Sequence, residues 1–100
     1  MRSDGFNLNL DGADVARVFL SIPSTRKVVL EFVYPDMVDV RLICPPDRAL
    51  PVAEEFLAKY YGGRKISIRV SGPAQAKPYE LNFKEWFERT LADLREQTKG

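Results

Sequence analysis

The sequence predicts a single domain of the α+β class. Several short segments alternate apolar and polar residues, which is typical of strands with one buried face. Other segments repeat apolar residues at helical spacing, as a helix with one buried face does. The chain of 100 residues is 45% hydrophobic and 29% charged, which is the size and balance of one globular domain. We therefore expect residues 1–100 to form one domain, with residues 1–5 as a flexible end.

Residues 6–10 alternate strictly between apolar and polar side chains and predict the first strand. The next segment, residues 13–22, allows two interpretations. Its large apolar residues follow a helical spacing: Val15, Val18, Phe19 and Ile22. However, the preceding Asp11-Gly12 pair is a strong signal for a hairpin turn, and alternate residues of the segment are also apolar. We favour a helix that Pro23 ends, and a strand is the alternative.

Residues 26–34 and 38–44 predict two strands, joined by the turn-forming pair Pro35-Asp36. Each strand alternates, so matching their apolar faces sets the pairing register. Two pairs are then directly opposite on the outer face: Glu31 with Arg41, and Val29 with Ile43. The sequence thus predicts both a hairpin and its register.

A helix is predicted around Pro51, which suits the first helical turn. Its apolar stripe consists of Val52, Ala53, Phe56, Leu57 and Tyr60. Gly62-Gly63 favours the end of this helix, because glycine readily adopts the left-handed conformation found there. Residues 65–70 alternate and predict a further strand, and residues 72–81, with two prolines, predict a connector.

Residues 82–97 predict a C-terminal helix. Asn82 suits the N-cap, and Glu85 is placed to complete a capping box with it. The apolar face consists of Phe83, Trp86, Phe87, Leu91 and Leu94. We expect Trp86 to be largely buried against the rest of the domain.

The predicted element order is β-α-β-β-α-β-α. Its first six elements match the ferredoxin-like pattern, an antiparallel sheet with two helices on one face, and the last helix is an addition. The alternative is an antiparallel β-meander, with residues 13–22 as a strand, followed by α-β-α. The two orders differ only in the conformation of that segment.

Residue usage argues against most catalytic mechanisms. The sequence contains no histidine, so Ser-His and Cys-His nucleophile pairs and the commonest metal ligand are absent. Cys44 falls on the predicted inner face, where we expect a structural role. We interpret Asp11 and Asp14 as helix-capping acids rather than metal ligands. We therefore assign no catalytic residue, no cofactor and no metal, and we do not favour an enzyme.

Charge and hydropathy narrow the partners and the location. Lys and Arg total 15 against 14 Asp and Glu, and a net charge of +1 provides no strong field for nucleic acid or an anionic membrane. The N-terminal segment has no apolar run typical of a signal peptide, and no apolar stretch is long enough to span a bilayer. We expect a cytoplasmic protein with no membrane partner.

The candidate interaction surface lies on the outer face of the predicted hairpin. It consists of Val29, Glu31, Val33, Arg41 and Ile43. An outer face that only met water would not need three β-branched apolar residues, so we expect the C-terminal helix or a second subunit to cover them. In the ferredoxin-like order residues 26–34 form an edge strand, which favours pairing with another chain.

The sequence therefore favours a non-catalytic protein-interaction or regulatory module that forms a homodimer or binds another protein. A small nucleic-acid-binding domain is possible but not favoured, because the outer face lacks the aromatic residues on which bases stack. A small-molecule-binding domain or a histidine-free enzyme is the third interpretation, with a pocket between residues 72–81 and the sheet.

Overall fold

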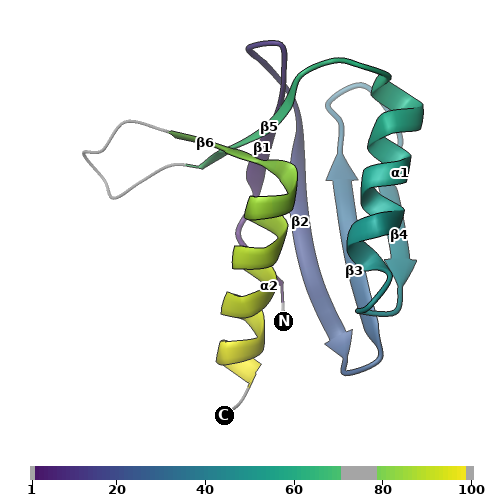
Figure 1. Cartoon of the computed structure of the whole chain (residues 1–100), viewed down its shortest axis with the longest axis vertical. Coiled ribbons are helices and arrows are strands. Elements are labelled where there is room, and N and C mark those ends of the chain that lie inside the picture. Colours follow the sequence, from purple (N-terminus) through teal and green to yellow (C-terminus); the bar gives the residue numbers. More distant parts are fainter. Residues whose placement is uncertain (1, 71–78, 99–100) are drawn as a thin grey trace.

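The computed structural model describes residues 2–70 and 79–98, and the side chains of all of these except residue 98. The fold is of the α+β class, as predicted. Six antiparallel strands form one sheet in the order β4-β3-β2-β1-β5-β6, and two helices pack on one of its faces (Figure 1). We call the face under the helices the inner face and the opposite one the outer face.

Four strands come first along the chain and form a meander. The elements are β1 (Phe6–Leu10), β2 (Ala13–Ser24), β3 (Lys27–Val33), β4 (Val40–Cys44), α1 (Ala49–Tyr61), β5 (Ile66–Val70), β6 (Tyr79–Asn82) and α2 (Phe83–Thr98). After α1 the chain returns to the other side of β1, where β5 pairs with it, and β6 pairs with β5. Strands β4 and β6 are therefore the two edges of the sheet in the described part of the chain.

The ferredoxin-like order is wrong, because residues 13–22 lie within strand β2 rather than in a helix. Asp11 and Gly12 have φ angles of 52° and 94°, the positive values that a tight two-residue hairpin turn requires. The Asn9 side chain holds this turn: its Oδ1 accepts the Gly12 N–H at 2.9 Å and its Nδ2 donates to Asp14 at 3.0 Å. The meander, which was the alternative order, is the one observed, with β6 as an additional strand.

The register predicted for the β3–β4 hairpin is confirmed. Glu31 is the cross-strand partner of Arg41, and Val29 is the partner of Ile43. Arg41 Nε lies 3.1 Å from Glu31 Oε2, so the pair also forms a charge-assisted hydrogen bond. Alternation alone was sufficient here, because a slip of one residue would turn the apolar set of each strand toward solvent.

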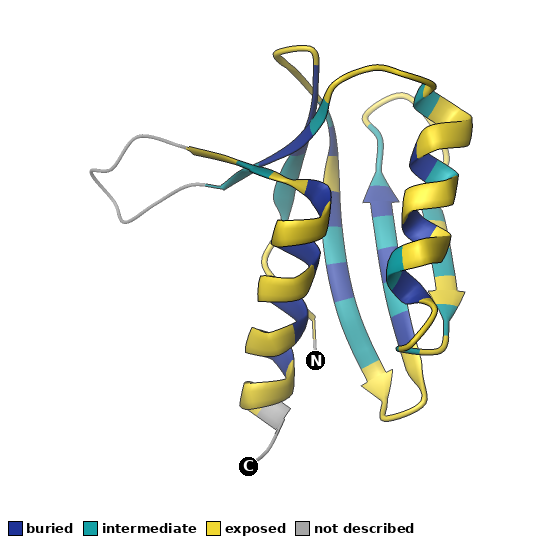
Figure 2. Ribbon diagram, viewed as in Figure 1, coloured by how far each residue is buried: buried dark blue, intermediate teal, exposed yellow. Residues whose placement is uncertain are grey.

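The core lies between the inner face of the sheet and the two helices. Figure 2 shows that the buried residues of both helices face the sheet, whereas their other sides are exposed. The strands contribute Leu8, Ala16, Val18, Leu20, Val28, Leu30, Phe32 and Ile68. The helices contribute Ala49, Ala53, Leu57, Phe83, Trp86, Phe87, Leu91 and Leu94. The outer face has no helix over it in the described part of the chain.

Helix α2 begins as the sequence predicts. Asn82 Oδ1 accepts the backbone N–H of Glu85 at 2.8 Å, which caps the first turn. The Trp86 side chain is 1% exposed and meets Phe6 edge to face, with ring centroids 5.7 Å apart. Of the predicted connector, residues 72–78 lie outside the described residues, and Tyr79–Leu81 belong to strand β6. That strand escaped prediction because four residues directly after a proline carry too short a pattern.

The N-terminal residues continue the line of β1 along β2. The Ser3 N–H donates to the Leu20 carbonyl at 2.7 Å, and the Leu20 N–H donates to Ser3 Oγ at 2.9 Å. Arg2 forms an isolated antiparallel bridge with Ser21. This pairing places the Arg2 side chain near the outer face, where it contacts Phe19 and Glu31.

We expect Trp86→Ala to lower the free energy of unfolding by about 3–5 kcal/mol, because a large buried side chain leaves a cavity. The indole Nε1 has no hydrogen-bond partner within the described residues. Both Trp86→Phe and Trp86→Ala remove this unsatisfied donor, but Trp86→Phe should cost less because it leaves a smaller cavity. Urea denaturation measures both losses, and the exposed Glu88→Ala is the control, with a change within about 0.5 kcal/mol. A loss below about 1 kcal/mol for the alanine variant would contradict the burial.

Gly12→Ala should destabilise the fold through backbone conformation alone. A Cβ at this position would meet no atom within 4 Å, but φ is +94°. The left-handed region costs an L-residue about 1–2 kcal/mol, and we expect a loss of this size in urea denaturation. Gly12→Asn should lose less, because asparagine adopts positive φ more readily. Equal losses for the two variants would contradict the positive φ of residue 12 as their cause.

Candidate functional site

The five residues predicted as an interaction surface all lie on the outer face of β3 and β4. Glu31 pairs with Arg41, Val29 with Ile43, and Val33 stands opposite Arg17 of β2. A hollow of about 550 Å³ opens on this face. It is lined by Arg2, Ser21, Pro23, Val29, Glu31 and Arg41. The structure therefore brings the predicted residues together.

The structure excludes one of the two covers expected for this surface and corrects the expected edge position of β3. Helix α2 does not cover Val29, Val33 and Ile43, because it packs on the inner face against β2, β5 and β6. Strand β3 is not an edge, because β2 and β4 flank it. Both errors follow from the ferredoxin-like order, which lacked the strand formed by residues 13–22. Ile43, on the true edge strand, is 62% exposed, whereas Val29 and Val33 are half-buried.

A cluster of charged and aromatic side chains occupies the middle of the outer face. Glu31 lies between two arginines, 3.3 Å from Arg2 and 3.1 Å from Arg41. The Arg2 guanidinium also lies over the Phe19 ring, 3.7 Å from its centroid, in cation–π geometry. The one large aromatic ring in this cluster is thus covered by a side chain of the same chain.

The other outer-face arginines also have partners. Arg69 lies 3.5 Å from Asp14 of β2 and 3.8 Å from Glu80 of β6, so its side chain spans β1. Arg17 donates to the Gly5 carbonyl at 2.9 Å. Nucleic acid binding depends mainly on cations that neutralise phosphates. On this outer face, nearby carboxylates already pair with most of the arginines.

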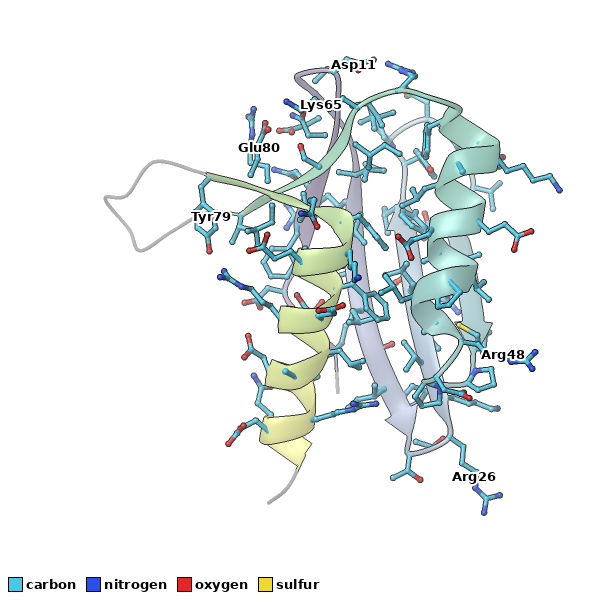
Figure 3. All side chains as sticks on the ribbon, viewed as in Figure 1. Asp11, Arg26, Arg48, Lys65, Tyr79 and Glu80 are labelled. Carbon is cyan, nitrogen blue, oxygen red and sulfur yellow. The ribbon has the colours of Figure 1, made fainter. Side chains whose placement is uncertain are left out.

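The exposed large hydrophobic side chains gather at one edge of the sheet. Among the described residues, five of the six lie on β4, on the loop that leads into it, or on α1, which packs against it: Met37, Val38, Ile43, Val52 and Tyr60. We call these five residues, together with the free side of β4, the β4-edge surface. The sixth residue, Tyr79, lies on β6 at the opposite edge, as its label in Figure 3 shows.

Of these five residues, only Ile43 belonged to the interaction surface that the sequence predicted. Val52 and Tyr60 belonged to the predicted apolar stripe of α1 and were expected to be buried. The structure divides that stripe. Ala53 and Leu57 are buried, as is Ala49 one turn before them, whereas Val52 and Tyr60 on the neighbouring side of the helix are exposed. The stripe was wider than one buried face needs, and this width was the sequence feature that could have predicted exposed apolar residues on the helix. The apolar pair Met37-Val38, directly after the turn, was a second such feature of the sequence.

Aromatic rings connect this surface to the core. The ring centroids of Phe32 and Phe56 are 5.2 Å apart, and those of Phe56 and Tyr60 are 4.9 Å apart. Beside them, the hydroxyl groups of Tyr34 and Tyr61 are hydrogen-bonded to each other. Burial, together with this bond, raises the pKa of the Tyr34 phenol above its ordinary value. The loop after β3 is thereby attached to the C-terminal end of α1.

The remaining side chains that could take part in a reaction or bind a metal are Cys44, Asp11 and Asp14, and their contacts favour structural roles. Burial raises the pKa of the Cys44 thiol, which disfavours the reactive thiolate. Asp11 does not cap a helix; it accepts hydrogen bonds from the Arg64 side chain at 2.9 Å and from the Lys65 backbone at 3.1 Å, and these lower its pKa. Asp14 accepts from Asn9 in the same turn region. Within residues 2–70 and 79–98, no group of three His, Cys, Asp or Glu side chains is placed to hold a metal ion.

Three comparisons with known proteins returned nothing: no family model matches the chain, and neither the curated proteins nor the solved structures contain a significant match. Neither described helix combines the length and the hydropathy needed to cross a membrane.

We expect the raised pKa of Tyr34 to make stability fall at high pH. A phenol whose pKa is higher in the folded state contributes fully below the unfolded value near 10.0, and this contribution is lost as the pH rises further. Urea denaturation between pH 8 and about 11.5 should show a steeper loss for the wild type than for Tyr34→Phe. The exposed Tyr79→Phe is the control and should retain the wild-type slope. Identical slopes for all three proteins would contradict a raised pKa of Tyr34 in the folded state.

Proposed function

We propose that this protein is a non-catalytic interaction module that associates with a second copy of itself through the β4-edge surface. The observation that carries the proposal is the clustering of five exposed hydrophobic side chains around one edge strand. Single exposed apolar residues are ordinary, but several of them around one edge strand favour an interaction site. An edge strand adds a row of unpaired backbone N–H and C=O groups beside them.

Strand β4 lacks most of the features that keep an edge strand from pairing. It contains no proline and no bulge, and Arg41 is its one charged residue. That charge is partly neutralised by Glu31 on the neighbouring strand. Strand β6 is also short and carries one charge, Glu80, but of the exposed large hydrophobic residues in the described chain only Tyr79 lies on it. An unprotected edge favours β4 as the place where another chain is added.

A homodimer is the simplest use of such an edge. Two identical edge strands can pair antiparallel about a two-fold axis, so that each copy offers the same surface to the other. The exposed residues of α1 lie beside β4 and would add side-chain contacts to the backbone pairing. The proposed interface therefore combines hydrogen bonding with apolar burial.

The alternatives have less support. Nucleic acid binding would use the outer-face arginines, but Arg2, Arg41 and Arg69 already face carboxylates. A small-molecule site would need a deep pocket with activated groups. The hollow of about 340 Å³ between the β2–β3 turn and the end of α2 contains one ionisable side chain, Arg95. Neither surface offers a feature comparable to the apolar edge.

Ile43→Lys should shift a dimer of the wild type toward monomer, because it places a charge in the apolar interface. We expect the dissociation constant in sedimentation equilibrium at micromolar concentrations to rise at least about tenfold, as when a hot-spot residue is lost. Tyr79→Lys is the matched control, because it changes an exposed hydrophobic residue on the opposite edge, and it should leave association unchanged. Far-UV circular dichroism checks that both variants fold.

The control also separates the two edges. Equal weakening by Tyr79→Lys and Ile43→Lys would argue against β4 as the interface. A wild type that stays monomeric up to several hundred micromolar would refute self-association.

A further inference from the structure

We infer the register of the interface: the second copy pairs antiparallel with β4 about a two-fold axis that passes beside Val40, so that Arg41 of each copy faces Asp39 of the other. This inference rests on the proposed self-association. It adds the identity of the facing residues, which charge and exposure along the edge determine.

The free edge is longer than strand β4 itself. Pro35 and Pro45 bound a proline-free segment, residues 36–44, of which only Val40–Cys44 pair with β3. Residues 38–39 precede β4 without turn or helix hydrogen bonding and without a sheet partner. Val38 is 86% exposed, the highest value among the exposed large hydrophobic residues of the described chain. A partner strand can therefore extend the pairing beyond the start of β4.

Symmetry limits the possible registers. A two-fold axis that joins two antiparallel edge strands side by side is perpendicular to the sheet. Such an axis keeps each side chain on its own face, so inner-face residues meet inner-face residues of the second copy. The axis must then pass beside a residue that faces its own counterpart. The α1 helices of the two copies therefore lie on the same side of the joined sheet.

Charge selects among these registers. An axis beside Arg41 would oppose the two arginines, and an axis beside Asp39 would oppose the two aspartates. An axis beside Leu42 would place Arg41 against Ile43 and Asp39 against Pro45. Only the axis beside Val40 opposes Arg41 and Asp39, and it does so twice. Opposite charges on facing residues stabilise a sheet, whereas like charges destabilise it.

The same register pairs the exposed apolar residues. Val40 faces Val40, Leu42 faces Val38 on the inner face, and Ile43 comes opposite Met37, which lies in the bend before this segment. Ile43 and Met37 are 62% and 54% exposed in the single chain, so the pairing covers two of the exposed residues with each other. On the outer face the charges then alternate across the strands, from Glu31 to Arg41 to Asp39 of the second copy.

A charge-exchange experiment tests this register. Asp39→Lys and Arg41→Glu should each raise the dissociation constant of the homodimer at least about tenfold, because like charges then face each other twice. An equimolar mixture of the two variants should restore association. In the mixed dimer the two substituted side chains face each other with opposite charges, and the native Arg41–Asp39 pair forms on the opposite side of the axis. Sedimentation velocity measures the dimer, and native mass spectrometry identifies the mixed species by mass.

Matched controls exclude an effect of net charge. Asp93→Lys on α2 and Arg26→Glu at the β2–β3 turn change the charge by the same amounts at exposed positions away from β4 (Figure 3 labels Arg26). Each of these variants should dimerise like the wild type. A restored mixture together with unaffected controls supports the register.

Other outcomes overturn the inference in distinguishable ways. A wild type that never dimerises overturns the proposed self-association as well, and leaves the edge for an extended segment of another protein. Variants that dimerise like the wild type overturn the register only, because another surface or another axis then joins the copies. Monomeric variants whose mixture stays monomeric also overturn it, since the two positions then do not face each other.

Discussion

The Asp11-Gly12 turn is the constraint on which the rest of this structure depends. Positive φ angles at both residues, held by the Asn9 side chain, bring the chain straight back beside β1. Residues 13–22 therefore join the sheet instead of crossing it as a helix. Because β2 then pairs with β1 and with β3, β3 becomes an interior strand and β4 an edge. A two-residue turn thus decides which strand is available to a partner.

The two faces of the sheet are stabilised in different ways. The inner face packs its apolar residues against two helices. The outer face has no such layer in the described part of the chain, and it combines half-buried valines with paired charges. Glu31 between Arg2 and Arg41, and Arg69 between Asp14 and Glu80, hold these charges in place across neighbouring strands. This pairing leaves a surface of low net charge, which suits contact with protein better than with a polyanion.

The proposed function places the two edges of the sheet in different roles. A β-domain that joins a partner through one edge needs the other edge to remain closed, because two open edges would allow chains to add without limit. Strand β6, with Tyr79 as the exposed large hydrophobic residue on it, fits the closed edge, and β4 with its apolar neighbours fits the open one. Self-association of this kind would end at a dimer.

The sequence by itself determined the features that depend on neighbouring residues. The β3–β4 register, the Asn82 cap and the burial of Trp86 followed from alternation, capping chemistry and an apolar stripe, and each is present. Only the tertiary structure decided whether residues 13–22 form a helix or a strand, because their apolar pattern fits both periods and the choice depends on pairing with β1 and β3. The same choice moved the open edge from β3 to β4. The exposure of Val38 and Tyr60 was likewise decided by packing, since an apolar residue at an edge has the same local pattern as one in a core.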